Sequence, residues 1–468
     1  MRTIITFFCV AACSAAWGDI ITLRNGDRIV ADSVHESNGR VEYTIGENTY
    51  AIPKSHVVKI ETGQAPEVPV LPRAVSSADL PSAGAALEGG IELSAQVVRN
   101  GQVNQAALKA IENEGIPEKT AAAYSMAAFF EDKQNDLASA ARYLQVALLF
   151  LPHHSILLEN YASTLLRLDK AAEALTYAQQ AVQANPRSAD AYAILGFAWY
   201  KNDHNREAIE AWKKSLELHP DPKLQAMLAR VERETKAEAE FHQQESSHFT
   251  LRYEGSRTPG VLRKEILTAL ESHYKDLESD LGASPQSIFV SLYTDQAFFD
   301  VTQAPSWTAA LNDGKIRVPV SGLTGVSPSL NRVLRHELTH SFVSQIAHGH
   351  APQWLNEGIA QIEEGSTTAP MGRNLAALYS AGRQVPLNQL ESNFITYSNG
   401  EASVAYAESL AAVEYIRVTY GQDEVAQILR GLGQGQSMET ALRGTIRLGY
   451  AQLETEIANY LARNYGKQ

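Results

Sequence analysis

The chain has 468 residues, and at about 150 residues per domain this length predicts about three domains. Its 40 Lys and Arg residues against 53 Asp and Glu residues give a formal net charge of −13, which repels a phosphate backbone and makes nucleic-acid binding a poor prediction. A composition with 44% hydrophobic and 20% charged residues fits a globular chain and excludes a disordered polyelectrolyte or a collagen-like repeat.

Residues 1–18 have the pattern of a signal peptide. Arg2 precedes an apolar run that is shorter than the about 20 residues a membrane span needs, so no transmembrane span is predicted. Ala-Trp-Gly at 16–18 resembles a signal peptidase site, which predicts a mature chain that starts at Asp19. Val-Ala-Ala-Cys13 also resembles a lipobox, in which Cys13 carries a lipid. We therefore expect an exported protein, periplasmic or secreted, with an envelope lipoprotein as the alternative.

Residues 19–62 are predicted to form a small all-β unit. Runs of β-type residues at 19–23, 40–45 and 56–60 are separated by turn residues, which is typical of short antiparallel strands. A five-stranded barrel that resembles an SH3-like fold is the expectation. Residues 63–90 hold four prolines among many Ala, Ser and Gly residues, and this composition predicts a linker.

Residues 91–243 have a helical pattern that repeats. Pro152, Pro186 and Pro220 recur at a spacing of 34 residues, as do three small residues that begin with Ala140. The region resembles three tetratricopeptide repeats (TPRs) over 121–154, 155–188 and 189–222, and an ordinary helical bundle is the alternative. A degenerate fourth repeat in 93–118 and a capping helix in 223–243 are also expected.

The TPR resemblance implies a concave groove that binds a protein or peptide, although such an array can also serve only to orient its neighbours.

The C-terminal part is predicted to be an α+β domain that turns mainly helical toward its end. Strand patterns at 247–253 and 287–293 flank a helical pattern at 259–281. A further strand-like run at 314–320 contains Pro319, which only an edge strand tolerates. An extended substrate could pair its main chain with that edge.

The segment Leu-Arg-His336-Glu337-Leu-Thr-His340 carries the decisive chemical pattern. His336 and His340 are four residues apart, so on a helix both imidazoles leave the same face one turn apart and can bind one ion. Zinc held by neutral imidazoles polarises a water molecule, and a carboxylate close by, here Glu337, can take its proton. The alternative interpretation is two surface histidines on an amphipathic helix.

A second segment, Trp-Leu-Asn-Glu357-Gly at 354–358, supplies the third protein ligand that a catalytic zinc needs. Glu357 follows His340 by 17 residues, which leaves room for the first helix to end near 348–350 and for an antiparallel second helix. Together the two segments resemble the gluzincin metallopeptidases, specifically the compact peptidase MA-like domains. The resemblance covers about residues 247–465, and the domain is predicted over 247–468.

This resemblance implies Zn²⁺ as the cofactor and a peptide or protein as the substrate. Matched residue by residue, it implies His336, His340 and Glu357 as the metal ligands and Glu337 as the general base. It also implies an oxyanion donor from a later helix. Tyr406 is the first candidate for that donor and Tyr397 the second, with a core aromatic as the alternative for either.

Other polar residues near these segments have two interpretations each. Gln361 lies one turn beyond Glu357 and could accept the second N–H of a ligating imidazole, or it could be a helix-surface residue. His348 and His350 are interpreted as helix-end or solvent residues rather than ligands. Glu363 and Glu364 could attract a substrate amine or could simply form a charged helix end.

The sequence therefore predicts an exported zinc metallopeptidase in which the TPR array recruits or positions a protein. Two other classes of function remain open. One is an envelope scaffold whose peptidase-like domain is inactive, and the other is a zinc hydrolase that acts on a substrate other than a peptide. Glu337 argues against the first of these, because a purely structural metal site has no use for a general base.

Overall fold

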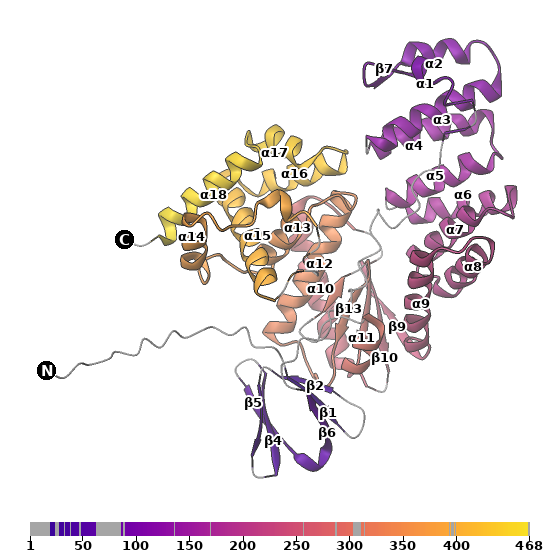
Figure 1. The fold of residues 1–468 in the computed structure, drawn as a ribbon. Helices are drawn as coiled ribbons and strands as arrows, with labels where there is room; N and C mark the ends of the chain where they lie inside the picture. Colours follow the sequence, from indigo (N-terminus) through magenta and orange to yellow (C-terminus); the bar gives the residue numbers. More distant parts are fainter. Residues whose placement is uncertain are drawn as a thin grey trace.

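The computed structural model describes residues 19–61, except 24–27, 32, 38 and 46–47, and residues 86–466, except 88, 135, 169, 256, 286–287, 303–309, 313, 393, 395–396 and 398. In chain order these residues form small β-sheets, an array of helices, a five-stranded sheet and a helical C-terminal part (Figure 1). This confirms the predicted multidomain fold class. The predicted signal peptide with Cys13, and most of the predicted linker, lie outside the described residues. No described helix is long and apolar enough to cross a membrane.

The N-terminal unit consists of two three-stranded antiparallel sheets, with strand orders β2-β1-β6 and β3-β4-β5. The described residues thus contain six strands where the sequence predicted five. Their bounds are β1 Asp19–Leu23, β2 Arg28–Ala31, β3 Ser33–Ser37, β4 Arg40–Ile45, β5 Asn48–Pro53 and β6 Val57–Glu61. Ile21, Val41 and Tyr43 form the small core between them.

Three helical hairpins with the predicted period make up the repeat array, which appears in Figure 1 as a curved arm. Small residues at the repeated positions allow the two helices of a hairpin to lie close together. In the third hairpin, a Cβ atom on Gly196 would overlap the buried indole ring of Trp212. The hairpins are α3 Pro117–Lys133 with α4 Leu137–Phe150, α5 Ser155–Arg167 with α6 Ala171–Ala184, and α7 Ala189–Lys201 with α8 Asn205–Leu218.

The ends of the array differ from the prediction. Residues 93–118 do not form a fourth helical pair; they contain α1 Ser94–Val97, a hairpin of β7 Val98–Arg99 and β8 Gln102–Val103, and α2 Gln105–Glu112. The reason is a tight turn at Asn100 and Gly101, whose φ angles of 51° and 72° are those a two-residue hairpin loop needs. The capping helix, α9 Pro222–Ala237, ends before β9 Phe241–Glu245 begins.

The C-terminal domain, which follows the repeat array, is built on a five-stranded sheet with strand order β12-β13-β11-β10-β9. The three central strands run parallel, and the two outer strands pair antiparallel to them. Helix α10 Gly260–Leu281 connects β10 to β11, and α11 Asp295–Thr302 follows β11. The strands are β10 Phe249–Glu254, β11 Ile288–Tyr293, β12 Leu311–Asn312 and β13 Ile316–Pro319.

One prediction about this sheet is wrong: the strand that contains Pro319 is not the edge. The short strand β12 covers it, pairing Leu311 with Arg317 and Asn312 with Ile316. Pro319 is tolerated because it lies beyond the residues that β12 pairs with, so its missing N–H costs no bond on that side. Among the described strands, β12 is therefore the edge on this side of the sheet, and β9 is the edge on the other side.

The helical part of this domain packs on the same core as the sheet. Its helices are α12 Pro328–Ile346, α13 Gln353–Glu363, α14 Gly372–Ser380, α15 Asn399–Tyr420, α16 Gln422–Gly433, α17 Met438–Ile446 and α18 Tyr450–Tyr465. Helices α12, α13 and α15 lie together beside the sheet (Figure 1).

A buried ion cluster joins the repeat array to the sheet. Glu234 of α9 is fully buried, and its two carboxylate oxygens lie 2.9 Å from Lys315 Nζ and 2.8 Å from Arg317 Nη2. Lys315 Nζ also lies 2.9 Å from an oxygen of Asp203, at the end of α7. Burial alone would raise the pKa of Glu234, but Arg317 and Lys315 outweigh burial and hold that pKa far below its usual value. The array and the sheet thus share charges that neither could bury alone.

Glu234→Gln tests this cluster. The substitution leaves two buried cations short of a counter-charge, so the free energy of unfolding should fall by about 3 kcal/mol in urea denaturation. Glu217→Gln is the control, because Glu217 pairs with Lys214 on the exposed surface of α8, where an ion pair contributes below about 1 kcal/mol. Equal stability of the two variants would contradict a structural role for the cluster.

Candidate metal centre

Helix α12 carries the histidine pair on one side and core residues on the other. Ser327 caps its N-terminus by accepting a hydrogen bond from Leu330 N, and Pro328 occupies the first turn, where its missing N–H costs nothing. Leu334, Leu338 and Phe342 are fully buried in the domain core. This packing fixes the rotation of α12, so that His336 and His340 face helix α13.

Helix α13 brings Glu357 to the two imidazoles. His336 Nε2 lies 3.5 Å and His340 Nε2 lies 3.9 Å from Glu357 Oε2. The candidate ligand atoms of the three residues all lie within 4.8 Å of one another, and no other described group of His, Cys, Asp and Glu has such an arrangement. The structure therefore brings together the three residues that the sequence singled out as ligands.

The donor atoms of this group fit a metal ion. Glu357 Oε1 accepts a hydrogen bond from Gln353 Nε2 at 2.8 Å, whereas the buried Oε2 receives none from the described residues. A buried carboxylate oxygen without a donor is costly, and a cation between it and the two Nε2 atoms would satisfy it. Ligands around a tetrahedral metal with bonds of about 2.0–2.1 Å lie about 3.3 Å apart. The two distances from Glu357 Oε2 to the Nε2 atoms, 3.5 Å and 3.9 Å, are close to this value.

The second nitrogen of each imidazole is held by an oxygen. His336 Nδ1 lies 3.1 Å from Glu364 Oε2, and His340 Nδ1 lies 2.9 Å from Asn356 Oδ1. If each Nδ1 carries the proton, both Nε2 atoms keep their lone pairs for the metal. Ser366 Oγ in turn donates to Glu364 Oε1 at 2.6 Å.

Gln361 does not have the role that its position suggested. Its Nε2 donates to the backbone oxygen of Glu357 at 3.2 Å and to that of Tyr406 at 3.0 Å, so the side chain points toward α15 and away from the imidazoles. Asn356 and Glu364 hold the imidazoles instead. Their positions relative to Glu357 could have indicated this role. Asn356 adjoins Glu357 in the sequence, and Glu364 follows Glu357 by two helical turns at the end of α13.

The two acidic residues at the end of α13 are both engaged. Glu363 Oε2 lies 2.9 Å from Arg335 Nη2, and Glu364 binds His336. This engagement argues against a free acidic site for a substrate amine. Burial alone would raise the pKa of Glu364, but His336 and Ser366 outweigh burial and keep that pKa below its usual value. Glu364 therefore stays charged beside the imidazole.

The two buried carboxyl groups of the site, Glu337 and Glu357, have pKa values shifted in opposite directions. Burial raises the pKa of Glu337, although His340 and His336 oppose that effect. Burial would also raise the pKa of Glu357, but there His340 and His336 outweigh it and hold the pKa below its usual value. Glu357 thus remains an anion and can serve as a ligand, while the raised pKa of Glu337 suits a group that takes up a proton near neutral pH.

Helix α15 approaches α13 closely and brings Tyr406 to the site. A Cβ atom on Gly358 would overlap the backbone oxygen of Ser409, so only glycine after Glu357 permits this contact. Burial, with Glu357 and Glu337 nearby, raises the pKa of Tyr406 well above its usual value, so its hydroxyl stays protonated and can donate. Tyr397 is engaged elsewhere: its hydroxyl donates to Gln389 O at 3.4 Å.

His348 and His350 follow the end of α12 and are not part of the group. The helix ends at Ile346, and His348 and Gly349 adopt φ angles of 48° and 74° as the chain turns toward α13. Both histidines are half-buried rather than solvent residues. Burial lowers the pKa of His350 to about 4, so its imidazole is neutral at physiological pH.

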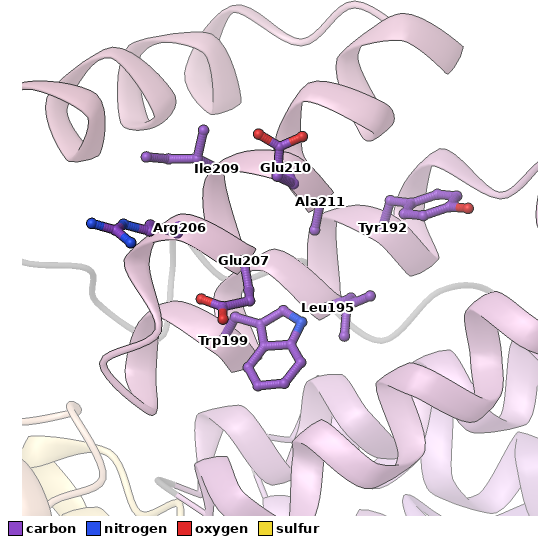
Figure 2. A pocket seen from close by; sticks show the side chains of 8 residues that line it. All are labelled: Tyr192, Leu195, Trp199, Arg206, Glu207, Ile209, Glu210 and Ala211. Atoms are coloured by element: carbon purple, nitrogen blue, oxygen red, sulfur yellow. The ribbon is translucent and has the colours of Figure 1, made fainter. Parts of the chain in front are cut away.

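A second feature of interest is a cavity of about 630 Å³ in the third hairpin of the array (Figure 2). Tyr192, Leu195 and Trp199 of α7 form one wall. Residues of α8, including the exposed Glu207 and Glu210, line the other side. The cavity thus combines apolar and aromatic surface with two carboxylates and the guanidinium of Arg206.

Comparison with known proteins identifies the C-terminal domain. Residues 274–463 match the model of the Peptidase MA superfamily. This part of the chain is a peptidase MA-like domain. The match includes α12, α13 and α15, and together with the helical hairpins it confirms the predicted combination of TPRs with a peptidase MA-like domain. No curated protein matches the chain.

Solved structures similar to this chain include TPR proteins. The first TPR of Spaghetti (RPAP3) bound to an HSP90 peptide is 24% identical, with 25% of this chain and 93% of that chain covered and a TM-score of 0.24. MamA from Desulfovibrio magneticus RS-1 is 22% identical, with 32% and 88% covered and a TM-score of 0.27. The O-GlcNAc transferase of Thermobaculum terrenum is 12% identical, with 75% and 95% covered and a TM-score of 0.23. Scores below 0.5 establish no shared overall fold.

Glu364→Gln tests the assigned support of His336 in the peptidase MA-like domain. The amide still accepts a hydrogen bond but removes the negative charge, so the affinity for zinc should fall about 10-fold or more in competition with a chelator. Gln361→Met is the matched control on the same helix and should change the affinity less than about 3-fold, because Gln361 does not contact an imidazole. A larger loss of zinc affinity in Gln361→Met than in Glu364→Gln would instead support Gln361 as the residue that accepts the second N–H of an imidazole.

Proposed function

We propose that the chain is an exported zinc metallopeptidase that cleaves peptide bonds and uses its TPR array to recruit a protein. The observation that carries the proposal is the convergence of His336, His340 and Glu357 beside the buried Glu337. Two imidazoles, one carboxylate and an open fourth position are the donor set of a catalytic zinc. The match of the domain to the Peptidase MA superfamily supports the reaction class.

The protein's own residues have distinct roles in this reaction. Zinc, when held by the three ligands, supplies Lewis-acid activation of water and of the peptide carbonyl. Glu337 takes a proton from the attacking water at its carboxylate and later gives a proton to the leaving amine. The protonated hydroxyl of Tyr406 donates to the oxygen on which negative charge develops. Glu364 and Asn356 hold the two imidazoles in the orientation that binding requires.

The main alternative is an inactive scaffold, and the state of Glu337 argues against it. This carboxyl group is buried beside the ligands, where its pKa is raised. Burial of this carboxyl group lowers stability, and the nearby imidazoles offset that cost only in part, so a site kept only for structure would favour its replacement.

The substitution Glu337→Gln tests whether the domain is an active enzyme or an inactive scaffold. The amide cannot accept a proton, so the variant should still bind one zinc per chain yet lose hydrolysis by about 10²-fold or more. We would measure zinc by elemental analysis and cleavage with a library of internally quenched peptides. His336→Ala is the control that should lose zinc and activity together. Full activity of Glu337→Gln would remove the general-base role.

We also propose that the cavity of the third hairpin is where the array recruits its protein. The aromatic and aliphatic wall formed by Tyr192, Leu195 and Trp199 suits an apolar side chain. The charged side chains of Arg206, Glu207 and Glu210 suit polar or charged groups next to it.

Trp199→Ala tests recruitment. The loss of a large aromatic anchor should raise KM for a protein substrate about 10-fold or more, with cleavage of short quenched peptides unchanged. Leu149→Ala removes an exposed apolar side chain elsewhere on the array and should change neither value. An equal effect on protein and peptide cleavage would contradict recruitment at this cavity and would indicate that Trp199 only stabilises the array.

Export remains part of the proposal and rests on the pattern of residues 1–18. N-terminal sequencing of the mature protein distinguishes a free chain that starts at Asp19 from a lipoprotein that starts at Cys13. An intact Met1 would contradict both.

A further inference from the structure

The hairpin of β12 and β13 forms the edge of the sheet, next to the metal centre. Strand β12 contains only Leu311 and Asn312, and no described strand pairs with its outer side. A two-residue strand has too few ladder hydrogen bonds to hold its own position. The hairpin must therefore be fixed by side chains.

The side chain of Asn312 ties this edge to helix α12. Its Nδ2 donates to the backbone oxygen of Glu337 at 2.7 Å and to Ser341 Oγ at 2.8 Å. Its Oδ1 accepts from Gly314 N at 3.0 Å, which closes the turn between the two strands. One amide thus shapes the hairpin and anchors it to the helical turn that carries the general base.

The opposite side of the hairpin is anchored in the repeat array. Lys315 and Arg317 point away from α12 into the buried cluster around Glu234. The hairpin is therefore held between α9 and α12, by charges on one side and by the amide of Asn312 on the other.

We propose that Asn312 is a positioning residue that fixes the edge strand β12 relative to Glu337. The inference rests on the proposed peptidase function, because an extended peptide would pair its main chain with this edge. A shift of one residue along a strand turns every side chain to the other face, so the position of β12 decides which peptide bond meets the site. The amide of Asn312 supplies both the donors for α12, through Nδ2, and the acceptor for Gly314 N, through Oδ1.

Asn312→Asp separates the two roles of the amide. The carboxylate keeps the acceptor for Gly314 N but loses both donors to α12. Asn331→Asp is the matched control, because Asn331 lies on α12, contacts His273 through its Oδ1 and has no side-chain hydrogen bond to the hairpin among the described residues. Both variants make the same chemical change and add the same charge.

Three quantities would be measured on the full chain with zinc bound: the zinc content, KM and kcat for an internally quenched peptide that the wild type cleaves, and amide hydrogen exchange of residues 311–317. Asn312→Asp should keep one zinc, raise KM about 10-fold with kcat changed less than about 3-fold, and speed the exchange about 10-fold. Asn331→Asp should leave all three values close to wild type. Ser341→Ala, which removes one of the two acceptors, should show a smaller change of the same kind and serves if Asn312→Asp does not fold.

Unchanged KM and unchanged exchange in Asn312→Asp would overturn the proposal. A fall in kcat at constant KM would also overturn it, because the residue would then act on the chemical step and not on the edge strand. A wild type that binds zinc but cleaves no peptide would contradict the proposed function instead. Hydrogen exchange would still decide in that case: faster exchange confined to Asn312→Asp supports the anchoring of β12, and unchanged exchange overturns it.

Discussion

The buried carboxylate of Glu357 is the constraint on which the candidate metal centre depends. A charged group in a protein interior is tolerated only with partners, and one of its oxygens has no hydrogen bond from the described residues. The imidazoles of His336 and His340 compensate the charge, which requires α13 to lie against α12. Gly358 makes this possible from the other side, because it lets α15 approach α13 closely. Three helices are thus positioned around one carboxylate.

A second set of buried charges determines how the parts of the chain act together. Glu234 of the repeat array neutralises Lys315 and Arg317 of the sheet, so the array is part of the same folded unit as the sheet. Strand β13, which contains Arg317, also pairs with β12, and Asn312 of β12 donates a hydrogen bond to α12. The repeat array, the edge of the sheet and helix α12, which carries Glu337, are therefore joined by direct contacts. Under the proposed function, a partner bound by the array would be held at a fixed place relative to the candidate metal centre.

Much of the architecture could be predicted because it depends on local or periodic patterns. The 34-residue period gave the helical hairpins, and the spacing of His336, His340 and Glu357 predicted two helices that face each other. The predictions were wrong at two short elements that do not follow the periodic patterns of the sequence. The turn at Asn100 and Gly101 replaced a helical pair by a hairpin, and a two-residue strand covered the predicted edge. The turn at Asn100 and Gly101 is a local signal that helical periodicity does not record, whereas β12 depends on contacts from a distant segment.

The sequence by itself determined which residue types could bind a metal and take a proton, because helical spacing places His336 and His340 on one face and Glu337 beside them. Only the tertiary structure decided which residues support them. Asn356 and Glu364, rather than Gln361, hold the imidazoles, because the packing of α13 between α12 and α15 sets its rotation. The partners of Glu234 and Asn312 lie far away in the chain, so their roles arise only when the segments fold together.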